Sequence, residues 1–243
     1  MMPQEEGRDC QQPGRPELLM VVPYITMKIR GYFDLSVLLQ DGMPIWPTNP
    51  PVRVQKEGTL EKDGYNVESY WSVTHSGTHI DAPFHMVDDG ATVDVIPIRQ
   101  LAGDGYVIRP ELEGGEITEG SLRKVWKDEY DGNIVLINTG WDKKRAFTHE
   151  FQYDFPGLAV NAIDFLLDHR PSVIGIDTLG IEPYDHEDFT VHKALLKTGM
   201  IFIEDLANLD KLQVGEKYLV VALPLKIQGA SGSMARVIAL DVQ

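Results

Sequence analysis

Short β-branched apolar runs alternate with helix candidates between about residues 105 and 206, and this alternation constrains the fold more than any other feature of the chain. The runs are YVIRPEL (106–112), NIVLINTGW (133–141), SVIGIDTLGI (172–181) and GMIFIEDL (199–206). The helix candidates between them span residues 121–129, 161–169 and 190–197. Continuous apolar runs of this length are typical of strands that are buried on both faces. The pattern therefore predicts an α/β fold.

Further strand candidates lie toward both ends of the chain. They span residues 27–39, 66–75, 217–227 and 235–243, and the small-residue turn QGASGS (228–233) joins the last two. Helical crossovers connect parallel strands, whereas a tight turn connects antiparallel ones. We therefore expect one central mixed sheet flanked by helices.

Length and composition favour a single domain. A chain of 243 residues with 43% hydrophobic residues has enough apolar material for one sizeable core. Residues 1–26 are predicted to form a loose extension before a domain over residues 27–243. The apolar run LLMVVPYI (18–25) is interrupted by Pro23 and follows an acidic segment, so neither a signal peptide nor a membrane span is expected.

The charge balance restricts the partners. The chain carries 22 Lys and Arg against 37 Asp and Glu, a formal charge of −15 that repels nucleic acids and anionic membranes. Cys10 is the single cysteine, so no internal disulfide can form and a reducing compartment, the cytoplasm, is expected. A small-molecule substrate is the expected partner.

The segment THSGTHIDAPFH (74–85) places three of the seven histidines within twelve positions. His75 and His79 would share one face of a helix, since they are four residues apart. Gly77 between them and Pro83 after them make a regular helix unfavourable. The segment is therefore predicted to be extended.

Extended backbone from Thr78 onward would place His79, Asp81 and His85 on the same side, because alternate side chains share a face. A turn at residues 76–77 would bring His75 alongside. Imidazoles and a carboxylate around one space form a ligand set suited to zinc or manganese. The alternative is a polar surface segment, which its apolar neighbours disfavour because buried polar groups need partners.

Two residues far along the chain extend this set. His192 lies in the helix candidate 190–197, and Glu204 interrupts the apolar strand candidate 199–206. A carboxylate in such a run either marks the exposed end of the strand or is held by a cation, because burying it alone is costly. Both explanations remain open from these residues.

The segment HSGTHIDAPFH resembles the H-x-G-T-H-x-D-x-P-x-H signature of the metal-dependent cyclase-like hydrolases, the group that includes bacterial kynurenine formamidase and isatin hydrolase. The likeness covers most of residues 31–243. It extends through PIWP (44–47), TGWD (139–142), FPGL (155–158), GIDT (175–178), HKALLKTGMIFIEDL (192–206) and ALPLKIQGASGSMARVIAL (222–240).

The resemblance implies a partly barrel-like mixed sheet, assembly into homodimers or homotetramers, and a site for two ions of zinc or manganese. His75, His79 and Asp81 would hold one ion, and a bridging Asp81 would join His192 and Glu204 on the other.

The resemblance also implies roles beyond the ligands. His85 would be the acid/base residue, although a third metal ligand or a prop for the ligands is the alternative. Trp46, in the proline-studded loop 41–52, would line the substrate pocket, although it could equally plug the core.

The implied function is hydrolysis of an amide, formamide or cyclic amide C–N bond, as in an arylformamidase or an isatin hydrolase. The alternatives are a lactone hydrolase on the same metal site and a non-catalytic metal-binding assembly protein.

Other enzyme classes lack their motifs. GASGS carries Ser233 where a nucleophile elbow needs glycine, and HEDFTVH carries Thr190 where H-E-x-x-H needs histidine. No phosphate loop or complete dinucleotide fingerprint occurs, so no nucleotide cofactor is expected. Asp142 and Asp177 are predicted to bond loop backbone.

Overall fold

The structure, a computed structural model, describes residues 28–243. The predicted extension 1–26 and the apolar run 18–25 lie outside the described residues, and the domain start at residue 27 stays a prediction. The strands are β1 (Ile29–Asp34), β2 (Arg53–Gly58), β3 (Val67–Trp71), β4 (His79–Asp81), β5 (Ala102–Ile108), β6 (Ile134–Ile137), β7 (Val173–Ile176), β8 (Ile201–Glu204), β9 (Lys217–Pro224) and β10 (Gly232–Val242). The α-helices are α1 (Leu60–Asp63), α2 (Ile98–Leu101), α3 (Glu119–Val125), α4 (His149–Tyr153), α5 (Ile163–His169) and α6 (Thr190–Leu196).

Seven strands close into a barrel in the order β10, β4, β8, β7, β6, β5, β9, and β9 pairs back with β10. The neighbours from β5 to β8 pair in parallel through helical connections. The other neighbours in the ring pair antiparallel, and β1 lies outside the ring against β10. The predicted single-domain α/β fold with a mixed, barrel-like sheet is confirmed.

Side chains of the parallel strands β5 to β8 point alternately to the two faces of the sheet, and this divides the apolar core into two layers. On β6, Ile134 and Leu136 belong to the core cluster inside the barrel. The residues between them, Val135 and Ile137, belong to an outer cluster that also contains apolar residues of α3, α5 and α6. Both faces of these strands are therefore covered, which explains their continuous apolar sequences.

Most predicted elements form, although their bounds differ: β6, β7 and β8 are shorter than their candidates, whereas β5 and β10 begin earlier, at Ala102 and Gly232. The candidate 27–39 ends as β1 at Asp34, where the side-chain carboxylate accepts a hydrogen bond from the backbone N–H of Ser36 and starts a turn. Within the described chain, no helix has the length and apolar character that crossing a membrane requires.

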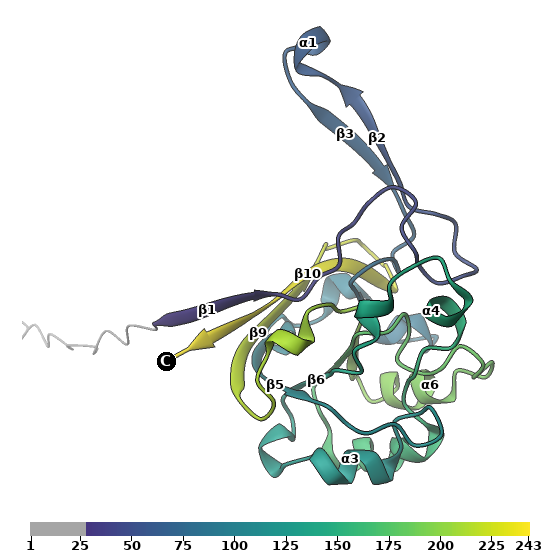
Figure 1. Cartoon of the computed structure of the whole chain (residues 1–243), viewed down its shortest axis with the longest axis vertical. Coiled ribbons are helices and arrows are strands. Elements are labelled where there is room, and N and C mark those ends of the chain that lie inside the picture. Colours follow the sequence, from purple (N-terminus) through teal and green to yellow (C-terminus); the bar gives the residue numbers. More distant parts are fainter. Residues whose placement is uncertain (1–27) are drawn as a thin grey trace, which may run out of the picture.

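One predicted strand lies outside the barrel. The candidate 66–75 becomes β3, which pairs antiparallel with the unpredicted strand β2 in a separate two-stranded sheet capped by the short helix α1. Residues 53–71, here called the arm, project away from the barrel (Figure 1). The alternating pattern of 66–75 reflects a hairpin with two open faces, since all five residues of β3 are exposed.

Candidate metal centre

Successive side chains of β4 point to opposite faces of the sheet, which places the polar site outside the apolar interior of the barrel. Ile80 is fully buried in the inner core, so its neighbours His79 and Asp81 point to the opposite side, toward the helices. His79 lies directly across from Glu204 in the β4–β8 ladder. His79, Asp81 and Glu204 are all buried.

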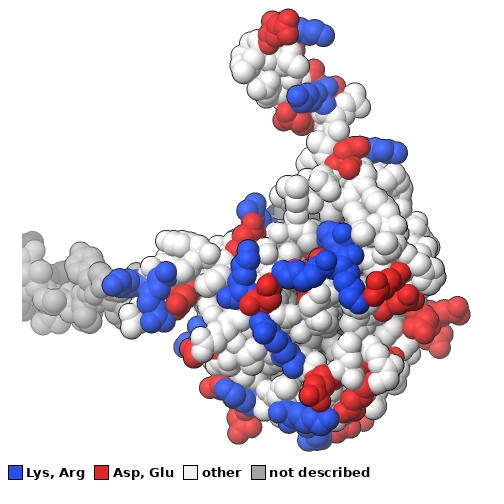
Figure 2. Space-filling view, viewed as in Figure 1, with Lys and Arg blue, Asp and Glu red and all other residues white. Residues whose placement is uncertain are grey.

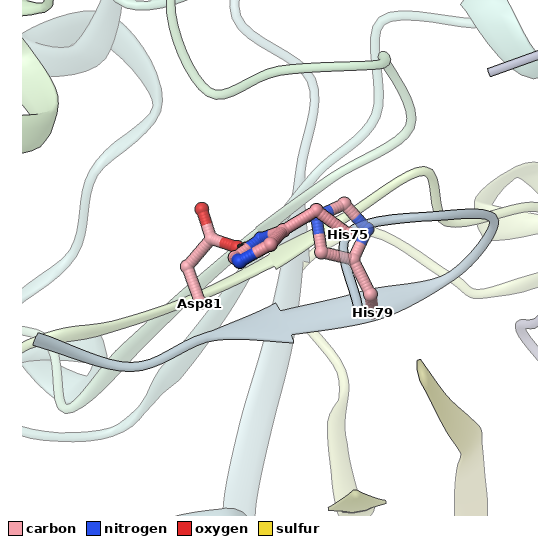
Figure 3. A group of neighbouring side chains, drawn as sticks. All are labelled: His75, His79 and Asp81. Carbon is pink, nitrogen blue, oxygen red and sulfur yellow. Dashed lines mark hydrogen bonds and ion pairs between the residues drawn. The ribbon is translucent and has the colours of Figure 1, made fainter. Parts of the chain in front are cut away.

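A tight turn brings His75 over the same face of β4. Gly77 adopts a left-handed backbone conformation with φ of 61°, which reverses the chain between His75 and His79. The Nδ1 atom of His75 lies 2.7 Å from Oδ1 of Asp81, and its Nε2 atom lies 2.8 Å from the Ser231 hydroxyl. Figure 3 shows the three side chains gathered above β4, as the predicted turn requires.

Helix α6 and strand β8 complete the cluster. The Nε2 atom of His192 lies 3.2 Å from Oε1 of Glu204 and 3.8 Å from Oδ2 of Asp81. The Nε2 atom of His79 lies 3.3 Å from Asp81 and 3.4 Å from Glu204. The structure therefore brings together all five predicted ligands, and Glu204 is buried among imidazoles instead of marking an exposed strand end.

Backbone and side-chain hydrogen bonds aim the imidazoles inward. His79 bonds the carbonyl of Gly77 through Nδ1, at 2.8 Å, which leaves Nε2 facing the cluster. His192 is held by Glu182, whose carboxylate bonds Nδ1 and accepts the backbone N–H of the same residue. A carboxylate behind a ligand histidine fixes its orientation and raises its basicity.

Sequence reasoning missed Glu182 and Ser231. Glu182 is 1% exposed and follows the apolar run 172–181 directly, ten residues before His192. That position was a usable signal, because an acid so close to a buried strand needs a partner. Ser231 lies in the small-residue turn before β10, where nothing in the sequence distinguishes one serine from another.

The donor set fits a divalent cation. Ligand-type atoms of His75, His79 and Asp81 lie within 4.8 Å of one another, and so do those of Asp81, His192 and Glu204. Within the described part of the chain, Oδ2 of Asp81 is buried and has no hydrogen-bond partner. A cation would satisfy this oxygen, and two buried carboxylates among neutral imidazoles need positive charge nearby.

When no cation is bound, protons on the histidine rings supply the positive charge that the two carboxylates need. Burial favours the neutral His79 ring, but hydrogen bonds with Asp81 and Glu204 outweigh this and raise its pKa to about 10. Burial likewise opposes protonation of His192, but Glu182 and Glu204 raise its pKa to about 10. A metal ion bound at these rings would therefore compete with protons for the same nitrogens.

His85 lies beside the cluster, but its backbone conformation differs from the predicted extended one. The extended segment stops at Asp81, because Pro83 begins a 3₁₀ turn over Pro83–His85 in which the His85 N–H bonds the carbonyl of Ala82. The His85 ring stacks on His75 at 4.0 Å between centroids, and its Nε2 lies 4.0 Å from Oδ2 of Asp81. Burial lowers the pKa of His85, which favours a neutral ring at neutral pH.

A cavity of about 200 Å³ opens beside the cluster. Its polar wall is formed by His75, His79, His85, His192 and Glu204. Its apolar wall includes Trp46, whose ring packs against Phe155, Tyr184 and Phe189 at centroid distances of 5.9, 5.1 and 6.4 Å. Trp46 therefore lines the cavity and also packs on the neighbouring apolar cluster, and its contact with a substrate stays a prediction.

The other two acids bond loop backbone, as predicted. Asp177 accepts hydrogen bonds from the backbone N–H groups of Thr139 and Gly140 and from the Thr139 hydroxyl. Asp142 accepts the backbone N–H of Asn208. These contacts hold the loops that follow β6, β7 and β8.

A mixed barrel with a buried imidazole–carboxylate cluster beside a cavity is the arrangement of a hydrolase that depends on a divalent metal. Residues 33–183 match the family model described as putative cyclase, and the chain belongs to this family. The predicted family resemblance is confirmed.

Relatives and solved structures of similar proteins agree with this assignment. The chain is 30% identical over 211 residues to the kynurenine formamidase of Erythrobacter litoralis, covering 86% of this chain and 93% of that enzyme. It is similar to a predicted metal-dependent hydrolase from Bacillus stearothermophilus, with 31% identity, a TM-score of 0.73 and coverage of 88% and 98%. It is also similar to an isatin hydrolase bound to the product analogue thioisatinate, with 27% identity, a TM-score of 0.77 and coverage of 87% and 92%.

Replacing Glu182 by Gln should weaken metal binding about 10–100-fold, because the His192 ring loses the charged partner that orients it. Chelator competition measures this affinity without any substrate. Asp185→Asn is the matched control, since it removes one exposed carboxylate of the same loop. Equal affinity in wild type and Glu182→Gln would contradict the orienting role.

Metal affinity should rise with pH between neutrality and about pH 10. Because His79 and His192 both have pKa values raised to about 10, both are protonated near pH 7 without metal, and binding must displace their protons. Titration calorimetry in buffers of different ionisation enthalpy should detect release of up to about two protons per chain near neutral pH. Binding with no proton release would rule out this competition.

Gly232 should tolerate no side chain. A Cβ atom there would lie 2.5 Å from Cε1 of His75 and 2.5 Å from the carbonyl oxygen of Ile80. Gly232→Ala is therefore expected to displace the His75 ring and lower metal occupancy, measured by elemental analysis. Gly103→Ala, where a Cβ meets nothing within 4 Å, should leave occupancy unchanged.

Proposed function

We propose that this metal-dependent hydrolase of amide C–N bonds acts on a small aromatic formamide or a cyclic amide. The observation that carries the proposal is one cavity wall that holds both the ligand cluster and His85. Because similar proteins are named kynurenine formamidase and isatin hydrolase, N-formylkynurenine and isatin are the first compounds to test.

We assign two zinc or manganese ions to the site. Two ligand groups that share Asp81 support this count, because one carboxylate can offer an oxygen to each of two cations. Imidazole and carboxylate donors suit both metals. His75 and His79 would serve the first position, and His192 and Glu204 the second.

A divalent ion held by these residues would polarise the substrate carbonyl and would lower the pKa of a bound water from ~16 to roughly 7. His85 is the residue of the chain placed to move the proton. Its Nε2 atom faces the cluster at 4.0 Å from Asp81, and its ring lines the cavity. His85 accepts a proton from the attacking water and returns it to the departing nitrogen.

The apolar wall orients the substrate and limits its size. Trp46 presents a ring held by neighbouring aromatics, so a flat substrate can stack on it at little entropic cost. The Gly180 backbone lies directly beneath, since a Cβ there would approach Cζ3 of Trp46 to 3.1 Å. A cavity of about 200 Å³ favours a compact aromatic molecule over a peptide.

Lactone hydrolysis at the same site is not favoured, because the similar proteins are a kynurenine formamidase and an isatin hydrolase, which act on amide C–N bonds. A non-catalytic metal-binding role is disfavoured by His85, since a purely structural site needs no further imidazole beside a cavity. We further place the enzyme in a reducing compartment such as the cytoplasm, as its single cysteine suggests, and propose that it forms a homodimer or homotetramer.

His85→Ala should reduce turnover by ~10²-fold or more while bound metal stays nearly unchanged, because a proton-transfer group is lost and no ligand is removed. Initial rates with N-formylkynurenine, isatin and a simple aryl lactone, together with elemental analysis, measure both quantities. Asp81→Ala is the contrasting variant and should lose the metal itself. Undiminished turnover in His85→Ala would remove His85 from the mechanism, and a wild type that hydrolyses neither N-formylkynurenine nor isatin would contradict the proposed substrate class.

A further inference from the structure

Phe189 occupies a backbone position that does not suit its side chain. It directly precedes α6, and its φ of 49° lies in the left-handed region. A bulky residue in this region is an outlier, because its Cβ atom crowds the neighbouring backbone. Residues held in such conformations gather at functional sites, where the surrounding structure enforces them. Local backbone preference therefore does not explain why a phenylalanine occurs here.

Phe189 also does not cap the helix that it precedes. The residue before a helix is most often Ser, Thr, Asp or Asn, whose side chain accepts a backbone N–H of the first turn. Phe189 makes no such bond. Glu182 instead accepts the backbone N–H groups of Val191 and His192, at 3.2 and 3.0 Å. Because a carboxylate from outside the helix caps α6, position 189 is free to carry an apolar ring.

The ring of Phe189 lines the cavity beside the ligand cluster. Its centroid lies 6.4 Å from that of Trp46, and the two ring planes are inclined by 46°. It meets the His192 ring edge to face, with 5.9 Å between centroids and 81° between planes. Phe189 therefore contacts both the aromatic wall of the cavity and a proposed metal ligand.

Backbone hydrogen bonds on both sides hold Phe189 in place. Its N–H bonds the carbonyl of His186 at 3.1 Å, and its carbonyl accepts the N–H of Lys193 at 3.0 Å. The Nζ atom of Lys193 bonds the carbonyl of Asp188 at 2.7 Å. The ring is therefore positioned before any ligand arrives, so that contact with it costs little ordering entropy.

Apolar contact is the main means by which this wall can select a substrate. Among the described residues, no Lys or Arg lines the cavity. Three of the four residues 185–188, which precede Phe189, are exposed acids. Figure 2 shows acidic side chains gathered on the side of the molecule where Figure 1 places α6. An anionic group of a substrate would therefore find no cationic side chain on this wall.

We propose that Phe189 is a specificity-determining residue that contacts the ring of an aromatic substrate. This role rests on the proposed function, since it assumes that the substrate reaches the cluster through this cavity. Trp46 and Phe189 offer two ring surfaces inclined to each other, so a flat ring can contact both. Edge and offset contacts between aromatic rings contribute binding beyond the area they bury. An aliphatic substrate lacks these contacts and should bind less tightly.

The test compares two metal chelators, one with an aromatic ring and one without. Benzohydroxamate and acetohydroxamate share the same chelating group, so the ratio of their dissociation constants on the zinc-loaded, full-length protein reports the ring contact. Titration calorimetry measures both constants, and the wild type should bind benzohydroxamate more tightly. Phe189→Leu keeps the apolar bulk but loses the aromatic ring, and should reduce this preference about 2–10-fold.

Two further variants make the comparison specific. Phe189→Tyr keeps the ring and should keep the preference. Tyr153→Leu is the matched control, since Tyr153 packs on Tyr184 at 4.8 Å and is not among the residues that line the cavity. Elemental analysis checks the zinc content of each variant, and Phe189→Met takes the place of Phe189→Leu if the latter loses its metal. An unchanged preference in the zinc-loaded variant, or a wild type without any preference, would overturn the proposal.

Thermal unfolding tests whether the ring is held against the local backbone preference. Phe189→Gly should unfold at a higher temperature than Phe189→Ala, because both lose the ring and only glycine adopts a φ of 49° without strain. The reverse order would show that position 189 is unstrained and would overturn this part of the inference. Neither measurement needs turnover, so a wild type that hydrolyses no substrate would contradict the proposed function while the chelator ratio still decides the contact at Phe189.

Discussion

Two buried carboxylates surrounded by histidines are the constraint on which the site depends. Asp81 and Glu204 are almost fully inaccessible, and neither can remain ionised there without positive charge close by. The imidazoles supply that charge only when protonated, whereas a divalent ion supplies it permanently and leaves them neutral. The same electrostatic requirement explains why the cluster suits a divalent cation, why protons would compete with that cation, and why the Glu182 carboxylate bonds the His192 ring.

The barrel strands make this arrangement possible because successive side chains of a strand lie on opposite faces. Apolar residues therefore lie on one face and the polar residues of the site on the other. Side chains that point inward from β4 and β8, such as Ile80 and Ile203, fill an apolar core. Their neighbours point outward to the helical layer, where α6 delivers His192. Barrel closure through β10 then places Ser231 and Gly232 beside His75, so the strand that completes the barrel also positions a proposed metal ligand.

Prediction from the sequence succeeded where the local pattern of apolar residues directly reflects how a strand is buried in the folded chain. The apolar runs of β6, β7 and β8 are buried on both faces, so their sequences alone indicated a helix-covered sheet. For residues 66–75 the pattern predicted the strand but not its place, since a polar–apolar alternation fits a strand of the barrel as well as a hairpin with two open faces. It also missed Glu182, whose importance comes from a helix that approaches it only in the folded chain.

The sequence by itself determined the fold class, the family and the residue types of the site, because periodicity and the H-x-G-T-H-x-D-x-P-x-H spacing are local properties. Only the tertiary structure decided that His192 and Glu204 meet Asp81, that His85 reaches the cluster through a 3₁₀ turn, and that the arm stands free. These features depend on strand register, barrel closure and the surface left uncovered, which are set by contacts between distant segments.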